Sequence, residues 1–202
     1  MPNVLVVSGA SRPESNLRAA IAAVEHALAA AGADVRVLDL AQTPLPILEA
    51  GSETQARLPE ITRVRELARW AIGFVLVTPE YHGSMSGALK NWFDFHYPEL
   101  AGKVAGVISV TGGGTGDMSI AAVKTCFAWC HGFTLPFHAT VRPTDVEQDR
   151  IVSAKVVDRI DRIAHDVVRY APLVRGAFDD ARTLGSGAAA GLAGMHVDEE
   201  PG

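Results

Sequence analysis

Cysteine, long apolar runs and clustered basic residues are all scarce in this chain. Only two cysteines occur among 202 residues, and the spacing of Cys126 and Cys130 in a helical pattern is typical of buried apolar positions, so no disulfide framework is expected. No apolar run approaches the roughly 20 residues that span a bilayer, and the start of the chain lacks a secretory signal. With a net charge of −5 and no basic block, nucleic acid and anionic membrane surfaces are not expected as partners. These features favour a cytoplasmic protein.

Several nucleotide-binding and catalytic motifs are also missing. The stretch 8–17, SGASRPESNL, is neither G-x-G-x-x-G nor G-x-x-x-x-G-K-[ST], which argues against a Rossmann dinucleotide site and an NTPase phosphate loop. There is no G-x-S-x-G elbow, and the seven histidines show no metal-ligand spacing. Neither a side-chain nucleophile nor a bound metal is therefore expected.

What the chain does contain is an alternation of short apolar runs and helical patterns. Five runs are short, continuous and bounded by turn residues, which is typical of buried parallel strands. The expected strands are 4–8, 35–38, 72–78, 104–110 and 134–137, and the expected helices are 15–31, 59–70, 88–96, 119–132 and 152–170, the last one ending before Pro172. This order predicts one doubly wound α/β domain with a mostly parallel sheet. The low-complexity stretch from Leu184 predicts a disordered tail, 184–202.

The stretch 8–17 follows the first expected strand and precedes the first helix. Free N–H groups and the helix dipole favour an anion at such a helix start. The stretch adds hydroxyl, amide and guanidinium donors that suit a phosphate monoester, from Ser8, Ser11, Ser15, Asn16 and Arg12. An alternative is an ordinary helix cap by one of the serines, with Arg12 in solvent.

Two further unusual loops follow the third and fourth expected strands. Pro79-Glu80-Tyr81-His82 and then Gly83 combine an irregular backbone with two flat rings, which suits a planar heteroaromatic ligand. The alternative is a core Tyr81 and a surface His82. Thr111–Gly116 contains Gly112, Gly113 and Gly114, which let a backbone pass close to a ligand, or else form a mobile linker. Because ligands of such sheets bind at the carboxyl ends of the strands, we expect all three loops to form one site.

These loops resemble the motifs of the NADPH-dependent FMN reductase family, which is flavodoxin-like. The first loop is similar to Gly-Ser-x-Arg-x-x-Ser-x-Asn. The second is similar to Pro-Glu-Tyr-Asn-x-Ser/Gly followed by Gly-x-Leu-Lys-Asn-x-x-Asp, here at 79–84 and 87–94. The resemblance covers roughly residues 4–140. It implies a five-stranded parallel sheet of order 2-1-3-4-5, an FMN-binding reductase domain at 1–183, and a homodimer or homotetramer.

Three positions depart from the family pattern. Ala10 stands where the family usually has Ser, although Ser11 follows at once. Leu17 stands where the family has Asn, and Asn16 lies one place earlier. His82 replaces the Asn of Pro-Glu-Tyr-Asn. Because that residue lies near the flavin ring in the family, this last change bears on flavin potential and substrate choice more than on flavin binding.

The resemblance implies cofactor-binding roles for residues of all three loops. The implied FMN contacts are Ser11, Arg12, Ser15, Asn16 and Leu17 at the phosphate, Pro79, Glu80, Tyr81, His82 and Gly83 along the isoalloxazine, and Thr111, Gly112, Gly113 and Gly114 at its pyrimidine side. Tyr81 and His82 are also candidates to donate a proton to an acceptor. Lys90, Asn91 and Asp94 are expected to be structural, and Trp92, Phe93 and Phe95 to form a subunit interface or to face the core.

The implied activity is that of a flavoprotein oxidoreductase. Hydride would pass from NADPH or NADH through FMN to a small acceptor, which could be a quinone, an azo compound, a metal oxyanion or free flavin for a partner monooxygenase. The alternatives are a flavodoxin-type electron carrier and a flavin-bound sensor without nicotinamide turnover. Arg12 and the Pro-Glu-Tyr-His turn argue against the carrier.

Overall fold

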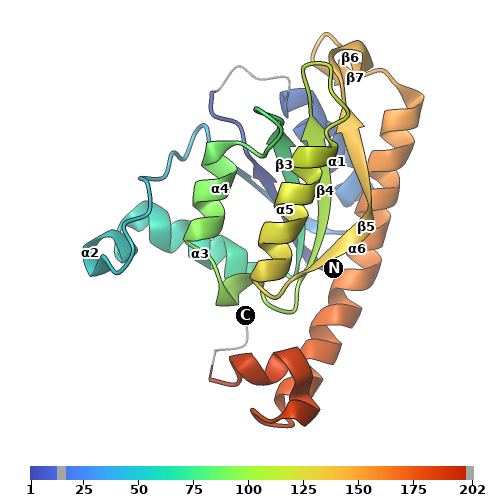
Figure 1. Ribbon diagram of the computed structural model, residues 1–202. Coiled ribbons are helices and arrows are strands. Elements are labelled where there is room, and N and C mark those ends of the chain that lie inside the picture. The colour runs from blue at the N-terminus through green and yellow to red at the C-terminus, as the bar shows by residue number, and fades with distance from the viewer. Residues whose placement is uncertain (13–16, 199–202) are drawn as a thin grey trace.

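The computed structural model describes residues 1–12 and 17–198. Its centre is a five-stranded sheet of order β2-β1-β3-β4-β5 in which all neighbouring strands are parallel (Figure 1). The strands are β1 (Asn3–Ser8), β2 (Asp34–Asp39), β3 (Gly73–Pro79), β4 (Val104–Val110) and β5 (Phe133–Val141). The predicted doubly wound, flavodoxin-like order is confirmed.

Helices cover both faces of this sheet, which explains why the central strands are continuously apolar. Every residue of β3 and β4 is buried. One face packs against α1 (Leu17–Ala30) and α6 (Ala154–Arg182), and the other against α3 (Pro59–Trp70), α4 (Gly87–Asp94) and α5 (Asp117–Trp129). Shorter elements complete the described fold: α2 (Glu53–Ala56), η1 (Pro98–Leu100), η2 (Pro143–Asp145), η3 (Ala188–His196) and the hairpin of β6 (Val146–Glu147) and β7 (Arg150–Ile151). None of the described helices is long and apolar enough to cross a membrane.

The aromatic residues of α4 and of its C-cap position lie in the core of the chain itself. Trp92, Phe93 and Phe95 are all buried, and the Trp92 ring contacts both Phe93 and Phe74 of β3. The predicted use of these aromatics as a subunit interface is therefore wrong, and the alternative of a core position holds.

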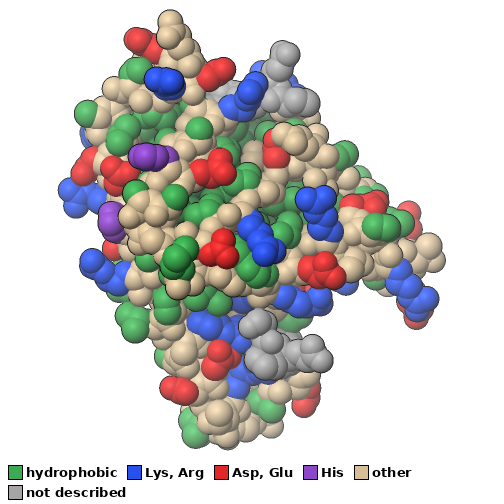
Figure 2. Space-filling model, turned by 180° about the vertical axis from the view of Figure 1, so that it is seen from behind, with side chains coloured by type: hydrophobic (Ala, Val, Ile, Leu, Met, Phe, Trp, Pro, Cys, Tyr) green, Lys and Arg blue, Asp and Glu red, His purple; other side chains and the backbone are tan. Residues whose placement is uncertain are grey.

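On the face opposite to that of Figure 1, acidic and basic side chains are interspersed (Figure 2).

Helix α6 is longer than predicted and continues through Pro172 to Arg182. Proline removes one helical hydrogen bond, which is why the sequence predicts an end near Tyr170. Tertiary packing outweighs that loss, because Ala171 and Phe178 on the same helix are buried. An ion pair between Arg175 and Asp179 supports the added turns.

The segment after α6 also differs from the expectation of a disordered tail. Residues 188–196 form η3, which lies beside α6. Ala193 packs with Phe178 and Ala101, and His196 is buried with its Nε2 2.7 Å from Nδ1 of His131. The extended α6 thus provides an apolar surface for a segment whose composition is of low complexity. Residues 199–202 lie outside the described residues.

The edge strand β5 is longer than the predicted 134–137 and contains Pro136. Proline is tolerated there because one side of an edge strand needs no sheet hydrogen bonds. The pairing with β4 shifts register between Ala105 and Val107. β5 therefore runs on to Val141 and brings Arg142 close to the loop after β4.

The two cysteines differ in burial, and only Cys130 has the buried position that the sequence predicts for both. Cys126 is half-buried, Cys130 is buried, and neither forms a disulfide. Burial raises the pKa of the Cys130 thiol to about 11, and that thiol donates to the carbonyl of His96. The Cys130 thiol is therefore protonated at neutral pH and is not a nucleophile.

Candidate functional site

Three loops meet at the carboxyl edge of the sheet, and direct contacts join them. We call 9–16 the first loop, 80–86 the second and 111–116 the third. The Gly9 N–H donates to the carbonyl of Val77, so the first loop starts against β3 (2.8 Å). The Glu80 N–H donates to the carbonyl of Val110, which joins the second loop to the end of β4 (3.0 Å). The predicted convergence of the three loops is thus present for their described residues.

Ser86 joins the first two loops, a role that the sequence analysis did not predict. Its fully buried hydroxyl donates to the Gly9 carbonyl (2.6 Å) and accepts from the Leu89 N–H (3.1 Å), which caps α4. A Cβ on Gly9 would lie 3.0 Å from the same hydroxyl oxygen, so a side chain there would require the two loops to shift by a few tenths of an ångström. A serine directly before a helical pattern is the cap signal that could have found it.

Glu80 joins the second loop to the third and to α5. Its Oε2 accepts from the Ser119 N–H in the first turn of α5 (3.2 Å), where a carboxylate is favoured by the helix dipole. A Cβ on Gly114 would lie 3.1 Å from Glu80 Oε1. The Glu80 side chain therefore positions both loops, while its backbone holds β4.

The second loop turns sharply at His82 and Gly83. Tyr81 and Ser84 exchange backbone hydrogen bonds of 3.0 Å, and the two residues between them both have positive φ (51° and 74°). Histidine and asparagine both tolerate this left-handed conformation better than most residues, so the departure from the family's Asn keeps the turn. The Tyr81 side chain is 45% exposed, so the alternative of a core tyrosine is wrong. His82 is exposed, as that alternative expected.

The third loop is fixed at both ends and open in the middle. Thr111 is buried, its N–H donates to Val141, and its hydroxyl donates to the Gly114 carbonyl (3.0 Å). Nothing lies within 4 Å of a Cβ built on Gly112 or Gly113. The exposed main chain fits the close approach of a planar ring that the resemblance implies.

The described part of the first loop presents polar groups to solvent. Ser11 and Arg12 are exposed, and the Ser11 hydroxyl lies 3.5 Å from the Tyr81 hydroxyl. The side chain of Leu17 is buried in the core, so the contact predicted between this residue and the phosphate would be made by its main chain. Ser15 and Asn16, also predicted at the phosphate, lie outside the described residues.

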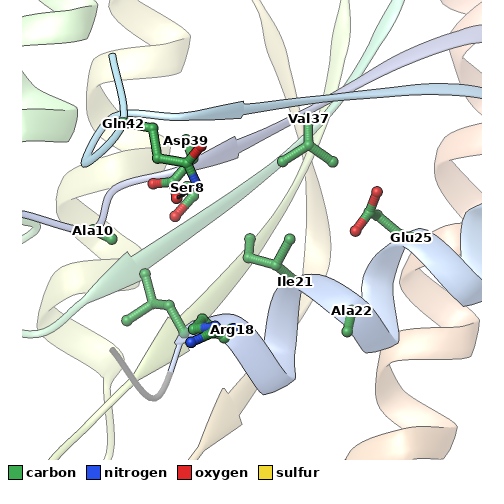
Figure 3. A pocket seen from close by; sticks show the side chains of 10 residues that line it. Ser8, Ala10, Arg18, Ile21, Ala22, Glu25, Val37, Asp39 and Gln42 are labelled. Carbon is green, nitrogen blue, oxygen red and sulfur yellow. Dashed lines mark hydrogen bonds between the residues drawn. The ribbon is translucent and has the colours of Figure 1, made fainter. Parts of the chain in front are cut away.

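A hollow of about 240 Å³ lies between α1 and β2, behind the first loop (Figure 3). Arg18, Ile21 and Glu25 of α1 face Asp39 and neighbouring residues across it. The Asp39 carboxylate already accepts from the Ala41 N–H (3.0 Å). With two carboxylates against one guanidinium among its described lining residues, this hollow does not favour a phosphate.

The segment after the second loop, 87–94, has a structural role, as the resemblance implies. The Asn91 amide donates to the carbonyls of Leu45 and Pro46 and accepts from the Leu48 N–H. It therefore holds the irregular segment that follows β2. Lys90 and Asp94 form an ion pair one turn apart on the exposed side of α4. Among the described residues no cluster of three or more metal-ligating side chains occurs.

The fold and the three converging loops define a flavodoxin-like protein. The model of the family described as NADPH-dependent FMN reductase matches residues 2–144. The chain therefore belongs to the NADPH-dependent FMN reductase family, and it is an NAD(P)H-dependent oxidoreductase with FMN as cofactor and NADPH or NADH as co-substrate.

Similar proteins agree with this assignment. The NADPH-dependent FMN reductase ArsH of Rhizobium meliloti (strain 1021) is 27% identical over 183 residues, which covers 86% of this chain and 74% of the relative. An NADPH azoreductase of Bacillus sp. (strain OY1-2) is 34% identical over 134 residues, covering 65% of this chain and 71% of the relative. The structure of FerB, a flavoenzyme NAD(P)H:(acceptor) oxidoreductase of Paracoccus denitrificans, superimposes with a TM-score of 0.70 at 18% identity, covering 86% of this chain and 98% of that one. The last comparison shows the shared fold.

Proposed function

We propose that this reductase transfers electrons from NAD(P)H, through FMN, to a small planar acceptor such as a quinone or an azo compound. The observation that carries the proposal is the exposed Tyr81 ring of the second loop, whose hydroxyl lies beside Ser11 of the first loop. A flat, half-exposed ring beside open main chain suits a flat acceptor better than a compact oxyanion. A relative from Bacillus sp. whose name is NADPH azoreductase supports this acceptor class.

The described residues divide the binding of FMN among the three loops. Arg12 and Ser11 hold the phosphate, together with the N–H groups at the start of α1 and the predicted Ser15 and Asn16. Main-chain groups of 79–83 and 111–114 lie along the ring, which the open side of Gly112 and Gly113 permits. When bound, FMN supplies hydride acceptance and transfer. The chain supplies position and exclusion of water.

Tyr81 and His82 face the acceptor in this proposal. The Tyr81 hydroxyl, 3.5 Å from Ser11, is a hydrogen-bond donor next to the loops. His82 stands at the tip of the turn, where its ring is exposed. These two side chains are the proposed donors to the oxygen or nitrogen of the reduced acceptor.

The test is the visible absorption spectrum of purified protein, followed by anaerobic addition of NADPH and then of one acceptor at a time. We expect flavin bands that bleach with NADPH and return with a benzoquinone or an azo dye. Bands that persist after NADPH and NADH would contradict turnover and favour a carrier or a sensor. A third outcome is that the bands bleach but return only with free FMN, and that the protein loses its flavin easily. This outcome would favour delivery of reduced flavin to a monooxygenase.

The proposal includes self-association as a homodimer or homotetramer. Exposed apolar groups of α5 and β5 support it, because Trp129 is 79% exposed and Phe133, which begins β5, is 48% exposed. Light scattering after size exclusion should give a dimer or tetramer mass for the native chain and a smaller one for Trp129→Ser. A monomer mass for the native chain would contradict this part.

A further inference from the structure

A second polar pocket, of about 310 Å³, lies beside the third loop. Its walls come from the start of α5, the end of β5, η2 and the first turn of α6. The groups that matter are three cationic side chains and three hydroxyls, Arg142, Lys155, Arg159, Thr115, Thr140 and Ser153. The binding of FMN proposed above uses none of these side chains.

The pocket carries more positive than negative charge, although the chain as a whole has a net charge of −5. Among the residues that the structure describes, two carboxylates, Asp117 and Asp145, line it against the three cations. Among the described residues none of the three cations forms an ion pair. The Asp145 carboxylate instead accepts from a main-chain N–H (2.8 Å). Unpaired cations that line one cavity favour an anionic ligand.

Arg159 is held in place by the chain, and both it and Lys155 keep hydrogen-bond donors that the described contacts do not use. Arg159 donates through Nε and Nη2 to the carbonyl of His138 (3.0 and 2.8 Å) and stacks on the Phe137 ring, so its guanidinium is fixed while Nη1 is unused in the described contacts. Lys155 is exposed in the first turn of α6, where the helix dipole adds to its positive charge. Burial lowers the pKa of His138, and nearby Lys124 and Arg159 lower it further, whereas Asp117 opposes this shift.

Two hydrogen bonds connect the pocket to the third loop. Arg142 Nε donates to the Gly114 carbonyl (3.4 Å), and the Thr140 hydroxyl donates to the Thr115 carbonyl (2.9 Å). A ligand that reaches over the third loop therefore meets the pocket next. In contrast, the phosphate site of the first loop follows β1, which two strands, β3 and β4, separate from β5. The pocket is thus a different anion site from that of the FMN phosphate.

NADPH differs from NADH by one phosphate monoester, on the 2′-oxygen of the adenosine ribose. We propose that the pocket formed by Arg142, Lys155 and Arg159 binds this 2′-phosphate and gives the enzyme a preference for NADPH over NADH. The inference rests on the function proposed above, because it requires a nicotinamide nucleotide to bind over the three loops.

Steady-state kinetics with both nucleotides provide the first test. For the double variant Arg142→Ala/Lys155→Ala, we expect kcat/KM for NADPH to fall about 10- to 100-fold, since charge-assisted hydrogen bonds are lost, while kcat/KM for NADH changes less than about twofold. The matched control is Arg162→Ala, which removes an exposed α6 arginine that pairs with Asp158 outside the pocket. Equal losses for NADPH and NADH, or an unchanged ratio, would overturn the proposal.

Binding without turnover provides the second test. Isothermal titration of the FMN-loaded native enzyme should show adenosine 2′,5′-bisphosphate binding about 10-fold or more tightly than 5′-AMP, and the double variant should lose this difference. Equal binding of the two nucleotides would overturn the proposal. The proposal would also be overturned if inorganic phosphate bound as tightly as the bisphosphate and did not displace NADPH. The pocket would then be a general anion site. If neither NADPH nor NADH is oxidised, the proposed function fails, while these titrations still decide the pocket.

Discussion

The polar groups at the two edges of the sheet differ in burial and in their hydrogen-bond partners. At the amino edge they are buried and paired inside the chain. Lys103, just before β4, is fully buried and donates to the carbonyls of Ala68 and Arg69 (2.8 and 3.2 Å), the unpaired end of α3. Glu99 is likewise buried and lies 3.1 Å from Arg69. At the carboxyl edge, Ser86 and Thr111 are also buried and paired, but the loops carry exposed polar groups as well, on Ser11, Arg12 and Tyr81.

The difference in burial means that polar groups at the amino edge stabilise the fold, whereas exposed polar groups at the carboxyl edge are available to bind a ligand. Polar groups that are buried must be satisfied within the protein, so the amino edge is closed by α3, η1 and the segment 184–198. Figure 1 shows that segment at the end of the molecule opposite to the β6–β7 hairpin. Groups that bind a ligand must stay available, so the carboxyl edge ends in loops. The same substitution should therefore act on stability at one edge and on binding at the other.

The largest effect is expected from Gly102→Ala at the amino edge. Gly102 has φ of +67°, and its Cβ would lie 2.2 Å from the Phe178 ring. Backbone strain and overpacking together should lower the free energy of unfolding by about 2–4 kcal/mol. Urea unfolding measures this as a lower midpoint. An unchanged midpoint would contradict the tight packing of α6 against this edge.

A pH dependence of stability should follow from Lys103. Burial lowers the pKa of Lys103 from 10.5 to about 7, and Arg175 adds to the shift. Between pH 7 and 9 the unfolded chain binds a proton that the folded chain has released, so the free energy of unfolding should rise with pH by about 2 kcal/mol. Below pH 7 both states hold the proton and this contribution is constant.

Urea unfolding at pH 7, 8 and 9 measures this effect. The variant Lys103→Met should show a flatter rise with pH than the native protein. Lys90→Met, on the exposed side of α4, is the control and should keep the native slope. Parallel curves for the native protein and Lys103→Met would contradict a lowered pKa.

The same glycine substitution at the carboxyl edge should act on binding. Gly112→Ala meets no atom within 4 Å, so the free energy of unfolding should stay within about 0.5 kcal/mol of the native value. The added methyl group occupies the space assigned to FMN, so we expect the Kd for FMN to rise about 10-fold, or about 1.4 kcal/mol. Flavin fluorescence titration measures it. A lower midpoint in urea with native FMN affinity would reverse the roles of the two edges.

The smallest effect is expected from Tyr81→Phe. The hydroxyl is exposed and its distance to Ser11 is long at 3.5 Å, so the Kd for FMN should change by less than about threefold. The kcat/KM for a quinone should fall more than the Kd for FMN rises, because the ring remains while the donor is lost. Tyr81→Ala is the matched variant that removes both. A tenfold loss of FMN affinity in Tyr81→Phe would assign the hydroxyl to cofactor binding.

Local sequence patterns predicted those strands and helices in which apolar residues recur regularly along the chain. The bounds of α3 and β4 agree with the prediction because their apolar periodicity is uninterrupted. The end of α6 and the fold of 184–198 could not be predicted, since both depend on Phe178 meeting Gly102 from a distant part of the sequence. The FMN contacts of the three loops stay predictions, and the role of Ser86 required its contact with Gly9.

By itself, the sequence determined the α/β class, the three loops and the resemblance to a reductase family, because each depends on neighbouring residues. The tertiary structure alone decided that Glu80 joins two loops, that the aromatics of α4 are internal, and that Arg142, Lys155 and Arg159 line one pocket. These residues come from separate elements, and only the packing of β5 and α6 against the sheet brings their charges together. Charge that is dispersed in sequence becomes a site only when folding concentrates it.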